Sequence, residues 1–124
     1  MESIGLVIVS HSKHIAEGVV ELISKVAKDV PITYVGGTEG GGIGTSFDQV
    51  DRVVSENPAD TLLAFFDLGS AKMNLKMVTD FSDKSIIINR VPIVEGVYNA
   101  AALLQAGAEL SVIQTQLAEL EINK

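Results

Sequence analysis

The chain has 124 residues, 47% of them hydrophobic and 20% charged, with a formal net charge of −7 at pH 7. This length and composition predict one soluble globular domain over residues 1–124, with a buried core. The negative charge disfavours nucleic acid and anionic membranes as partners. The absence of cysteine excludes disulfides and thiol catalysis and favours a cytoplasmic protein.

Four short apolar runs rich in β-branched residues predict four strands. They are Ile4–Val9, Ile32–Val35, Thr61–Phe66 and Ser85–Asn89. Each run is nearly continuous in apolar residues rather than alternating. That pattern is typical of parallel strands that are covered on both faces. None of these runs is long enough to cross a membrane.

Apolar residues at helical spacing fill the segments between and after these strands. In chain order they are Ile15, Val19, Leu22, Ile23 and Val26; then Met73, Met77 and Phe81; then Val97, Ala101 and Leu104; and finally Leu110, Ile113, Leu117 and Leu120. We interpret the methionine stripe as core packing rather than as part of a cofactor site.

Alternation of strands and helices predicts an α/β fold with right-handed crossovers. We expect a doubly wound, mainly parallel four-stranded sheet of order 2-1-3-4, flanked by helices. In such a sheet the order reverses between the first and third strands. Ligands bind beyond the carboxyl ends of the strands at that point.

Polar residues follow both strands at this predicted switch point. The first strand ends in Ser10-His11-Ser12, and Asp67 follows the third, ahead of Gly69 and Ser70. We expect His11 and Asp67 to face each other. An aspartate that accepts from one ring nitrogen leaves the other free as a nucleophile. A buried histidine with a purely structural role fits the same residues, and the pattern alone leaves both interpretations open.

A glycine-rich segment, 36–46, follows the second strand. Its glycines would let backbone amides approach an anion closely, and Thr45 or Ser46 can cap the next helix. The segment lacks the Gly-Lys-Ser/Thr of a P-loop and the glycine spacing of a dinucleotide fingerprint. A phosphate cradle and a mobile loop without a ligand both fit. Ser12 is expected to cap the first helix in either case.

Metal binding has little support in the sequence. His11, His14 and Asp67 could be drawn together as ligands, but we expect His14 to be a solvated residue of the first helical turn. Glu95 and the remaining carboxylates have ordinary structural explanations. We therefore predict neither a metal nor a cofactor.

Several short motifs, taken together, resemble a known family. "IVSHS" followed by "AEG", "IGTS" before the second helix, "DLGSA" after the third strand and "VEG" at the fourth helix occur in order. They are similar to the phosphotransferase-system subunit of bacterial dihydroxyacetone kinase, whose first domain belongs with the mannose-type IIA domains of sugar transporters. The similarity covers essentially the whole chain.

The resemblance implies a homodimeric phosphohistidine carrier with the fold expected above. His11 matches the phosphorylated histidine, and Asp67 matches the acidic residue that is bonded to its ring. The donor would be the phosphocarrier protein HPr. The acceptor would be ADP held on the subunit DhaL, while DhaK holds dihydroxyacetone. We expect phosphate-binding or docking roles for Ser12, Gly42, Gly44, Thr45, Ser46, Gly69 and Ser70.

Two other functions remain as alternatives. A sugar-transporter IIA domain would pass phosphate to a IIB domain, but such domains typically show His-Gly after the first strand and Gly-Gly-Ser-Pro after the third. His11-Ser12 and Gly69-Ser70-Ala71 stand here instead. The second alternative is a non-catalytic, flavodoxin-like binding or signalling module. A receiver-like module would need paired acidic residues where Ser10-His11-Ser12 stands.

Overall fold

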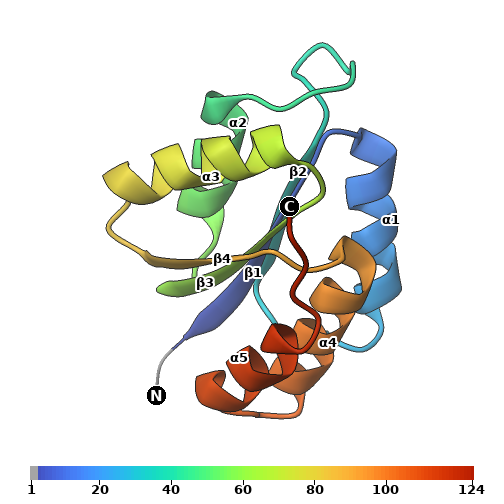
Figure 1. Cartoon of the computed structure of the whole chain (residues 1–124), viewed down its shortest axis with the longest axis vertical. Coiled ribbons are helices and arrows are strands. Elements are labelled where there is room, and N and C mark those ends of the chain that lie inside the picture. The colour runs from blue at the N-terminus through green and yellow to red at the C-terminus, as the bar shows by residue number, and fades with distance from the viewer. Residues whose placement is uncertain (1–2) are drawn as a thin grey trace.

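A computed structural model describes residues 3–124 of the chain. In that range four strands and five helices follow one another (Figure 1). The strands are β1 (Ile4–Ser10), β2 (Ile32–Gly36), β3 (Thr61–Phe66) and β4 (Ser85–Asn89). The helices are α1 (Lys13–Ser24), α2 (Phe47–Glu56), α3 (Gly69–Phe81), α4 (Ile93–Gln105) and α5 (Leu110–Ala118). All four predicted strands are confirmed, β1 and β2 each with one more residue at the carboxyl end.

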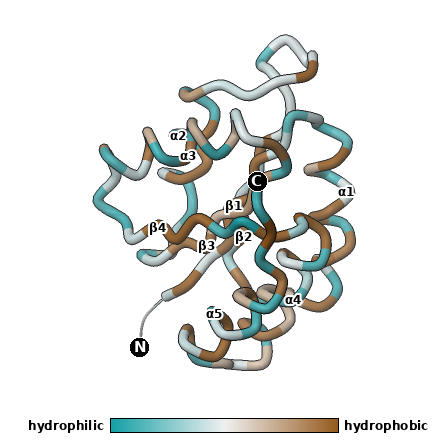
Figure 2. The backbone as a smooth tube through the Cα atoms, viewed as in Figure 1, coloured by the Kyte–Doolittle hydropathy of each residue, from teal (hydrophilic) through white to brown (hydrophobic). Residues whose placement is uncertain are grey.

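The strands form one parallel sheet in the order β2-β1-β3-β4. This confirms the predicted α/β fold and strand order. The two central strands, β1 and β3, are buried almost throughout, which explains their unbroken apolar runs. In Figure 2 these strands run through the middle of the molecule as largely hydrophobic tube.

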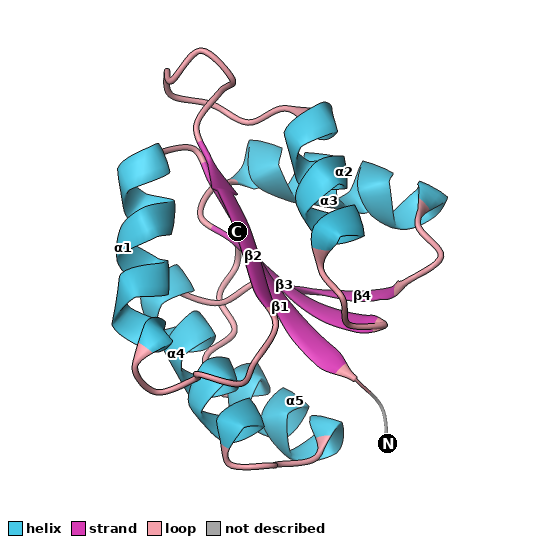
Figure 3. Ribbon diagram, turned by 180° about the vertical axis from the view of Figure 1, so that it is seen from behind, coloured by secondary structure: helices cyan, strands magenta, loops and turns pink. Residues whose placement is uncertain are grey.

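Helices cover both faces of the sheet, as Figure 3 shows from behind. On one face α1 and α4 pack against β1, and residues of α1, α4 and α5 form one apolar cluster with Leu6 and Ile8 of that strand. On the other face α2 packs against β1 and β2 and α3 against β3 and β4, and residues of both helices form a second apolar cluster with Val7 and Val9 of β1. Alternate side chains of β1 thus enter two separate apolar layers, as the pleat of a strand requires.

The predicted core role of the methionine stripe on α3 is wrong. Met73, Met77 and Phe81 are 64%, 47% and 79% exposed. The buried residues of α3 are instead Ala71, Leu75 and Val78. Both sets recur every three or four residues, so periodicity alone could not choose between two faces of one helix.

The other predicted helix faces are confirmed in part. On α1, Val19 and Ile23 are buried, but Ile15 and Leu22 are exposed. On the last two helices the inner positions are buried as expected; they are Val97 and Ala101 on α4 and Ile113 and Leu117 on α5. No helix of the described residues is both long and apolar enough to cross a membrane.

Strand register brings the predicted site residues to one edge of the sheet. Val9 of β1 pairs with Phe66 of β3, and Ser10 pairs with Gly36 of β2. The residues that follow, His11, Asp67 and the glycine-rich segment, therefore leave the sheet at the same level. This is the switch point that the strand order defines.

Candidate active site

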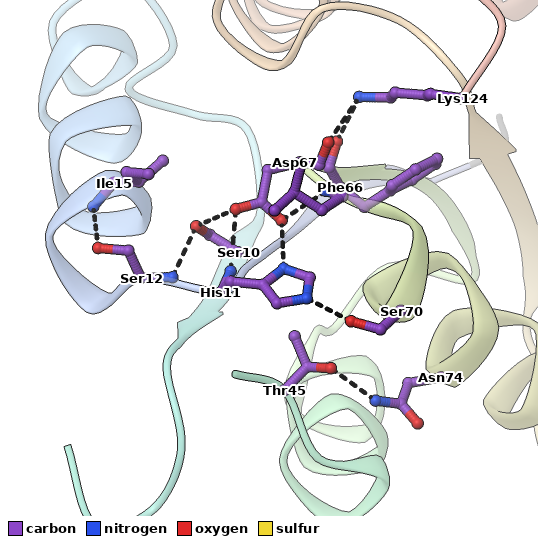
Figure 4. A network of polar contacts seen from close by, with 11 residues as sticks. Ser10, His11, Ser12, Ile15, Thr45, Phe66, Asp67, Ser70, Asn74 and Lys124 are labelled. Carbon is purple, nitrogen blue, oxygen red and sulfur yellow. Dashed lines mark hydrogen bonds and ion pairs between the residues drawn. The ribbon is translucent and has the colours of Figure 1, made fainter. Parts of the chain in front are cut away.

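The carboxylate of Asp67 is the centre of a hydrogen-bond network at this edge (Figure 4). Its Oδ1 lies 2.8 Å from Nδ1 of His11 and accepts from the main-chain N–H of Leu68 at 2.7 Å. Its Oδ2 accepts from the main-chain N–H of His11 at 2.9 Å and from the Ser10 hydroxyl at 2.7 Å. Both oxygens are thus held twice, which fixes the carboxylate in one orientation.

This network keeps Asp67 ionised. Burial alone raises the pKa of the carboxyl group, but the hydrogen bonds from His11, Ser10 and Leu68 outweigh it and hold the pKa below its ordinary value. The side chains of His11 and Asp67 are only 14% and 13% exposed, so water screens their interaction weakly. A carboxylate therefore faces the ring at neutral pH.

The charge of Asp67 decides which nitrogen of His11 can react. An ionised carboxylate only accepts hydrogen bonds, so Nδ1 must carry the ring proton. Nε2 then keeps its lone pair and lies against the hydroxyl of Ser70, which donates to it. Because Ser70 is exposed, the reactive nitrogen is directed toward the surface. The arrangement suits nucleophilic attack by Nε2 on an incoming group.

Ser70 belongs to the first turn of α3, and this helix begins without a side-chain cap. Its N-cap residue is Leu68, which has no polar side chain to offer the first N–H groups. The two predicted residues Gly69 and Ser70 thus open a helix beside Nε2. A helix start of this kind favours an anion through its free amides and its dipole.

Ser12 and Ser46 have capping roles, as the sequence predicted. The Ser12 hydroxyl accepts from the N–H of Ile15 at 3.4 Å at the start of α1. The Ser46 hydroxyl accepts from the N–H of Gln49 at 3.3 Å at the start of α2. Thr45, beside Ser46, accepts a 2.8 Å bond from the side chain of Asn74 on α3. That bond ties the end of the glycine-rich segment to the helix that carries Ser70.

Within the glycine-rich segment, the two predicted glycines use their amides inside the protein. The N–H of Gly42 donates to the Thr38 hydroxyl at 3.1 Å, and that of Gly44 donates to the carbonyl of His11 at 2.9 Å. Neither amide points freely at an anion. Gly44 has φ +143°, in the region that favours glycine. Gly44 thus holds the backbone of His11 in place through this hydrogen bond.

The sequence analysis assigned no role to three residues that contribute to the site. Ser10 is buried and joins Asp67 to the N–H of Ser12, which donates to its hydroxyl at 3.1 Å. Leu68 contributes only its main-chain N–H. Lys124 donates from Nζ to the carbonyl of Phe66 at 2.7 Å. Ser10 could have been found from its place at a strand end, whereas a main-chain donor and a lysine 57 residues from Asp67 leave no local pattern.

Among residues 3–124, no group of three or more histidine, cysteine or acidic side chains could hold a metal ion. His14, the third residue of the metal arrangement considered above, is exposed on the first turn of α1.

Comparisons with known proteins give the family and the fold of the chain. A family model, EIIA-man, described as the PTS system fructose IIA component, matches residues 5–114. A crystal structure of EF1359, a protein of unknown function, has a TM-score of 0.83 at 28% identity and covers 98% of this chain and 95% of that one. The sigma-54 interaction domain protein of Enterococcus faecalis shares the fold, with a TM-score of 0.73 at 12% identity.

Two relatives match the chain over nearly its whole length. The phosphotransferase subunit DhaM of the PTS-dependent dihydroxyacetone kinase of Lactococcus lactis is 53% identical over 97% of this chain and 98% of its own. The phosphoryl donor subunit DhaM of a PEP-dependent dihydroxyacetone kinase of Listeria innocua is 49% identical over 95% of each. The chain therefore belongs to the EIIA-man family. Within that family it belongs to the DhaM proteins, the phosphotransferase subunits of PTS-dependent dihydroxyacetone kinase.

Proposed function

We propose that Nε2 of His11 carries the phosphoryl group that this subunit takes up and hands on. The observation that carries the proposal is the His11–Asp67 pair. Its 2.8 Å contact occupies Nδ1 and leaves Nε2 directed at Ser70 and the surface. HPr, itself charged ultimately from phosphoenolpyruvate, is the proposed donor. A relay that starts from this metabolite belongs in the cytoplasm.

The transfer to His11 needs no separate acid or base. Nε2 attacks phosphorus, the bond from phosphorus to the donor breaks, and the donor keeps that electron pair. The ring retains its Nδ1 proton and becomes a phosphoimidazolium, whose positive charge the Asp67 carboxylate stabilises. In the second transfer an oxygen of the acceptor attacks phosphorus and forms the new O–P bond. The N–P bond breaks, its electron pair returns to Nε2, and the ring returns to the neutral form.

The added phosphoryl group needs its own stabilisation, because it brings about −1.5 to −2 charges beside a carboxylate. The uncapped start of α3 can supply it through the amides of Gly69 and Ser70. The Ser70 hydroxyl, displaced from Nε2 when phosphate binds there, can donate to a phosphate oxygen. Each helix terminus of this kind contributes about 0.3–1 kcal/mol.

We propose ADP bound on DhaL as the final acceptor, with dihydroxyacetone held on DhaK. A carrier of net charge −7 without a P-loop is poorly suited to hold a nucleotide itself. The cations that neutralise two reacting anions would then come from the partner, as metal ions bound to its nucleotide.

The segments around His11 also offer apolar side chains to a partner. Ile15 on α1, Ile43 in the glycine-rich segment and Leu68 before α3 are all exposed. Three separate segments thus present large apolar groups close to the reactive residue. We propose that they form the docking surface for both the donor and the acceptor subunit.

The central experiment is incubation with phosphoenolpyruvate, enzyme I and HPr, followed by mapping of acid-labile phosphate. The wild-type chain should carry phosphate on His11. His11→Gln should fold normally and accept none, whereas the matched control His14→Gln should accept phosphate at the wild-type rate. Persistent labelling of the first variant would end the proposal.

The acceptor is tested with the phosphorylated chain. It should give no measurable ATP from free Mg-ADP and should give ATP rapidly when the ADP is bound on DhaL. Efficient ATP formation without DhaL would mean that this domain has its own nucleotide site.

We further propose that the chain forms a homodimer. The support is the exposed stripe Met73, Met77 and Phe81 on α3, a helix that packs against the edge strand β4. Apolar patches of this kind commonly mark protein interfaces. Sedimentation equilibrium should give twice the chain mass, and Met77→Glu should shift it toward the monomer. A monomeric wild-type protein at micromolar concentration would contradict this.

A further inference from the structure

Lys124 reaches the back of the site from far along the chain. Its Nζ donates to the carbonyl of Phe66 at 2.7 Å and lies 3.4 Å from the carbonyl oxygen of Asp67. It also lies 4.5 Å from the centre of the Phe66 ring. Figure 4 shows the side chain directed at the end of β3, on the far side of Asp67 from the imidazole. The ammonium group therefore holds the strand end that carries the aspartate.

Contacts on both sides fix the segment that delivers this lysine. The N–H of Ile122 donates to the carbonyl of Arg90 at 2.8 Å, and the guanidinium of Arg90 pairs with Glu121 at 3.0 Å. On α3, Lys72 donates from Nζ to the carbonyl of Lys124 at 3.1 Å. The segment thus bridges the loop after β4 and the helix after β3 (Figure 1).

We propose that Lys124 is a positioning residue for phosphoryl transfer, acting through Asp67; this rests on the function proposed above. It fixes the peptide groups at the end of β3, so that the carboxylate meets Nδ1 of His11 in one orientation. It also brings a positive charge to the side of Asp67 away from His11. That charge offsets part of the negative charge that accumulates when a phosphoryl group arrives.

Physical reasons support both roles. A hydrogen bond from an ammonium group to a carbonyl is stronger than one between neutral groups. Burial lowers the pKa of Lys124, and the charge of Asp67 opposes that shift, so the ionised carboxylate favours the charged form of the lysine. Lys124 donates to two carbonyls at the end of β3, and without it they would lose this donor in a partly buried place.

The test compares Lys124→Met, Lys124→Arg and the control Lys28→Met in the full chain. Lys124→Met keeps the apolar stem but loses the charge and the donors, whereas Lys124→Arg keeps both. Lys28 is exposed and lies beyond α1, at the opposite end of that helix from His11. The quantities to measure are the rate of phosphoryl uptake from HPr, its dependence on HPr concentration, and the proton NMR signal of Nδ1–H of His11.

We expect Lys124→Met to lower the maximal uptake rate about tenfold, the loss expected for one charge-assisted hydrogen bond. The KM for HPr should not change, because Lys124 lies behind the reacting ring. The Nδ1–H signal should move or broaden in this variant. Lys124→Arg should recover most of the rate and the signal, and Lys28→Met should match the wild type in both.

Two results would overturn the inference. One is a Lys124→Met variant with a wild-type rate and a wild-type Nδ1–H signal. The other is a Lys124→Arg variant with the same uptake rate and Nδ1–H signal as Lys124→Met, while both keep the wild-type melting temperature. That result would show that the charge of Lys124 is not what matters. The NMR signal does not depend on phosphoryl transfer. It therefore tests Lys124 even if His11 accepts no phosphate.

Discussion

Helices α2 and α3 pack side by side on one face of the sheet, yet they begin in different ways. The start of α2 is closed by the Ser46 hydroxyl, which accepts from the N–H of Gln49. The start of α3 has Leu68 at the N-cap and no side-chain oxygen. The preceding residue, Asp67, has a carboxylate of the kind that caps helices, but most of its bonds go to His11 and Ser10. The uncapped start of α3 lies beside Nε2 of His11 and keeps amides available to an anion, whereas the cap on α2 stabilises that helix.

The largest effect is expected from removing the carboxylate that links the open helix start to the imidazole. Asp67→Ala should slow phosphoryl uptake by roughly 100-fold, because the ring loses both its tautomer and its orientation. Circular dichroism should stay unchanged, since the sheet does not depend on this side chain. Asp60→Asn, an exposed position at the other end of β3, serves as the control and should be neutral.

The same experiment tests the choice of nitrogen. Nitrogen-15 NMR of the phosphorylated wild-type protein should report phosphate on Nε2 and a proton on Nδ1. Phosphate on Nδ1, or an Asp67→Ala variant that takes up phosphate at the wild-type rate, would break the proposed link between Asp67 and the reactive atom.

A smaller effect is expected from substitutions in the glycine-rich segment, which leads into the capped helix α2 and holds the His11 backbone through Gly44. Gly44→Val should slow transfer by about tenfold, because φ +143° suits no β-branched residue and a Cβ would meet Thr38 Cγ2 at 3.0 Å. Strain there would move the N–H that holds the His11 carbonyl. The domain should remain folded, since the segment lies outside both apolar layers.

Gly40 provides a matched control in the same segment. A Cβ at this position would meet nothing within 4 Å, and its backbone is not in the left-handed region. Gly40→Ala should therefore leave the transfer rate and the melting temperature unchanged. Equal losses at the two glycines would show that the rate depends on the flexibility of the whole segment and not on Gly44.

The sequence predicted the fold and the contact between His11 and Asp67 better than it predicted their surroundings. Parallel, buried strands leave unbroken apolar runs, so strand positions and order followed from composition and connectivity. His11 and Asp67 came from the same reasoning, because both follow strands that meet at the switch point. The face of α3 could not be predicted, since Leu75 and Met73 are both large and apolar and occur at helical spacing.

Long-range polar partners were also out of reach. Lys124 meets the end of β3 only because the segment after α5 returns across the sheet, and nothing in its own neighbourhood encodes that path. The amides of Gly42 and Gly44 were expected to be available to an anion. The structure instead gives them acceptors on Thr38 and His11, which depends on how the segment folds back on itself.

The smallest effects are expected at Ser46, which caps the start of α2, and at Ser70, in the first turn of the uncapped helix α3. These two serines give the most direct comparison of the two helix starts. Ser46→Ala should lower the free energy of unfolding by about 1 kcal/mol, because α2 loses its cap. Its phosphoryl uptake should stay at the wild-type rate. Ser70→Ala should slow uptake only a few-fold, because the hydroxyl exchanges a bond to Nε2 for one to the arriving phosphate, and should leave the unfolding free energy unchanged.

Urea denaturation measures the free energy of unfolding of the two variants, and uptake kinetics measures their rate of phosphorylation. Each variant should change one of these quantities and leave the other at the wild-type value. Ser70 contacts Nε2 but caps nothing, and Ser46 caps α2 without a bond to His11 in the described part of the chain. Both substitutions remove a serine hydroxyl at the start of a helix, and the two helices are neighbours. Any difference between their effects therefore comes from where the hydroxyl lies. Loss of stability in Ser70→Ala, with uptake unaffected, would mean that the open start of α3 is an ordinary structural feature.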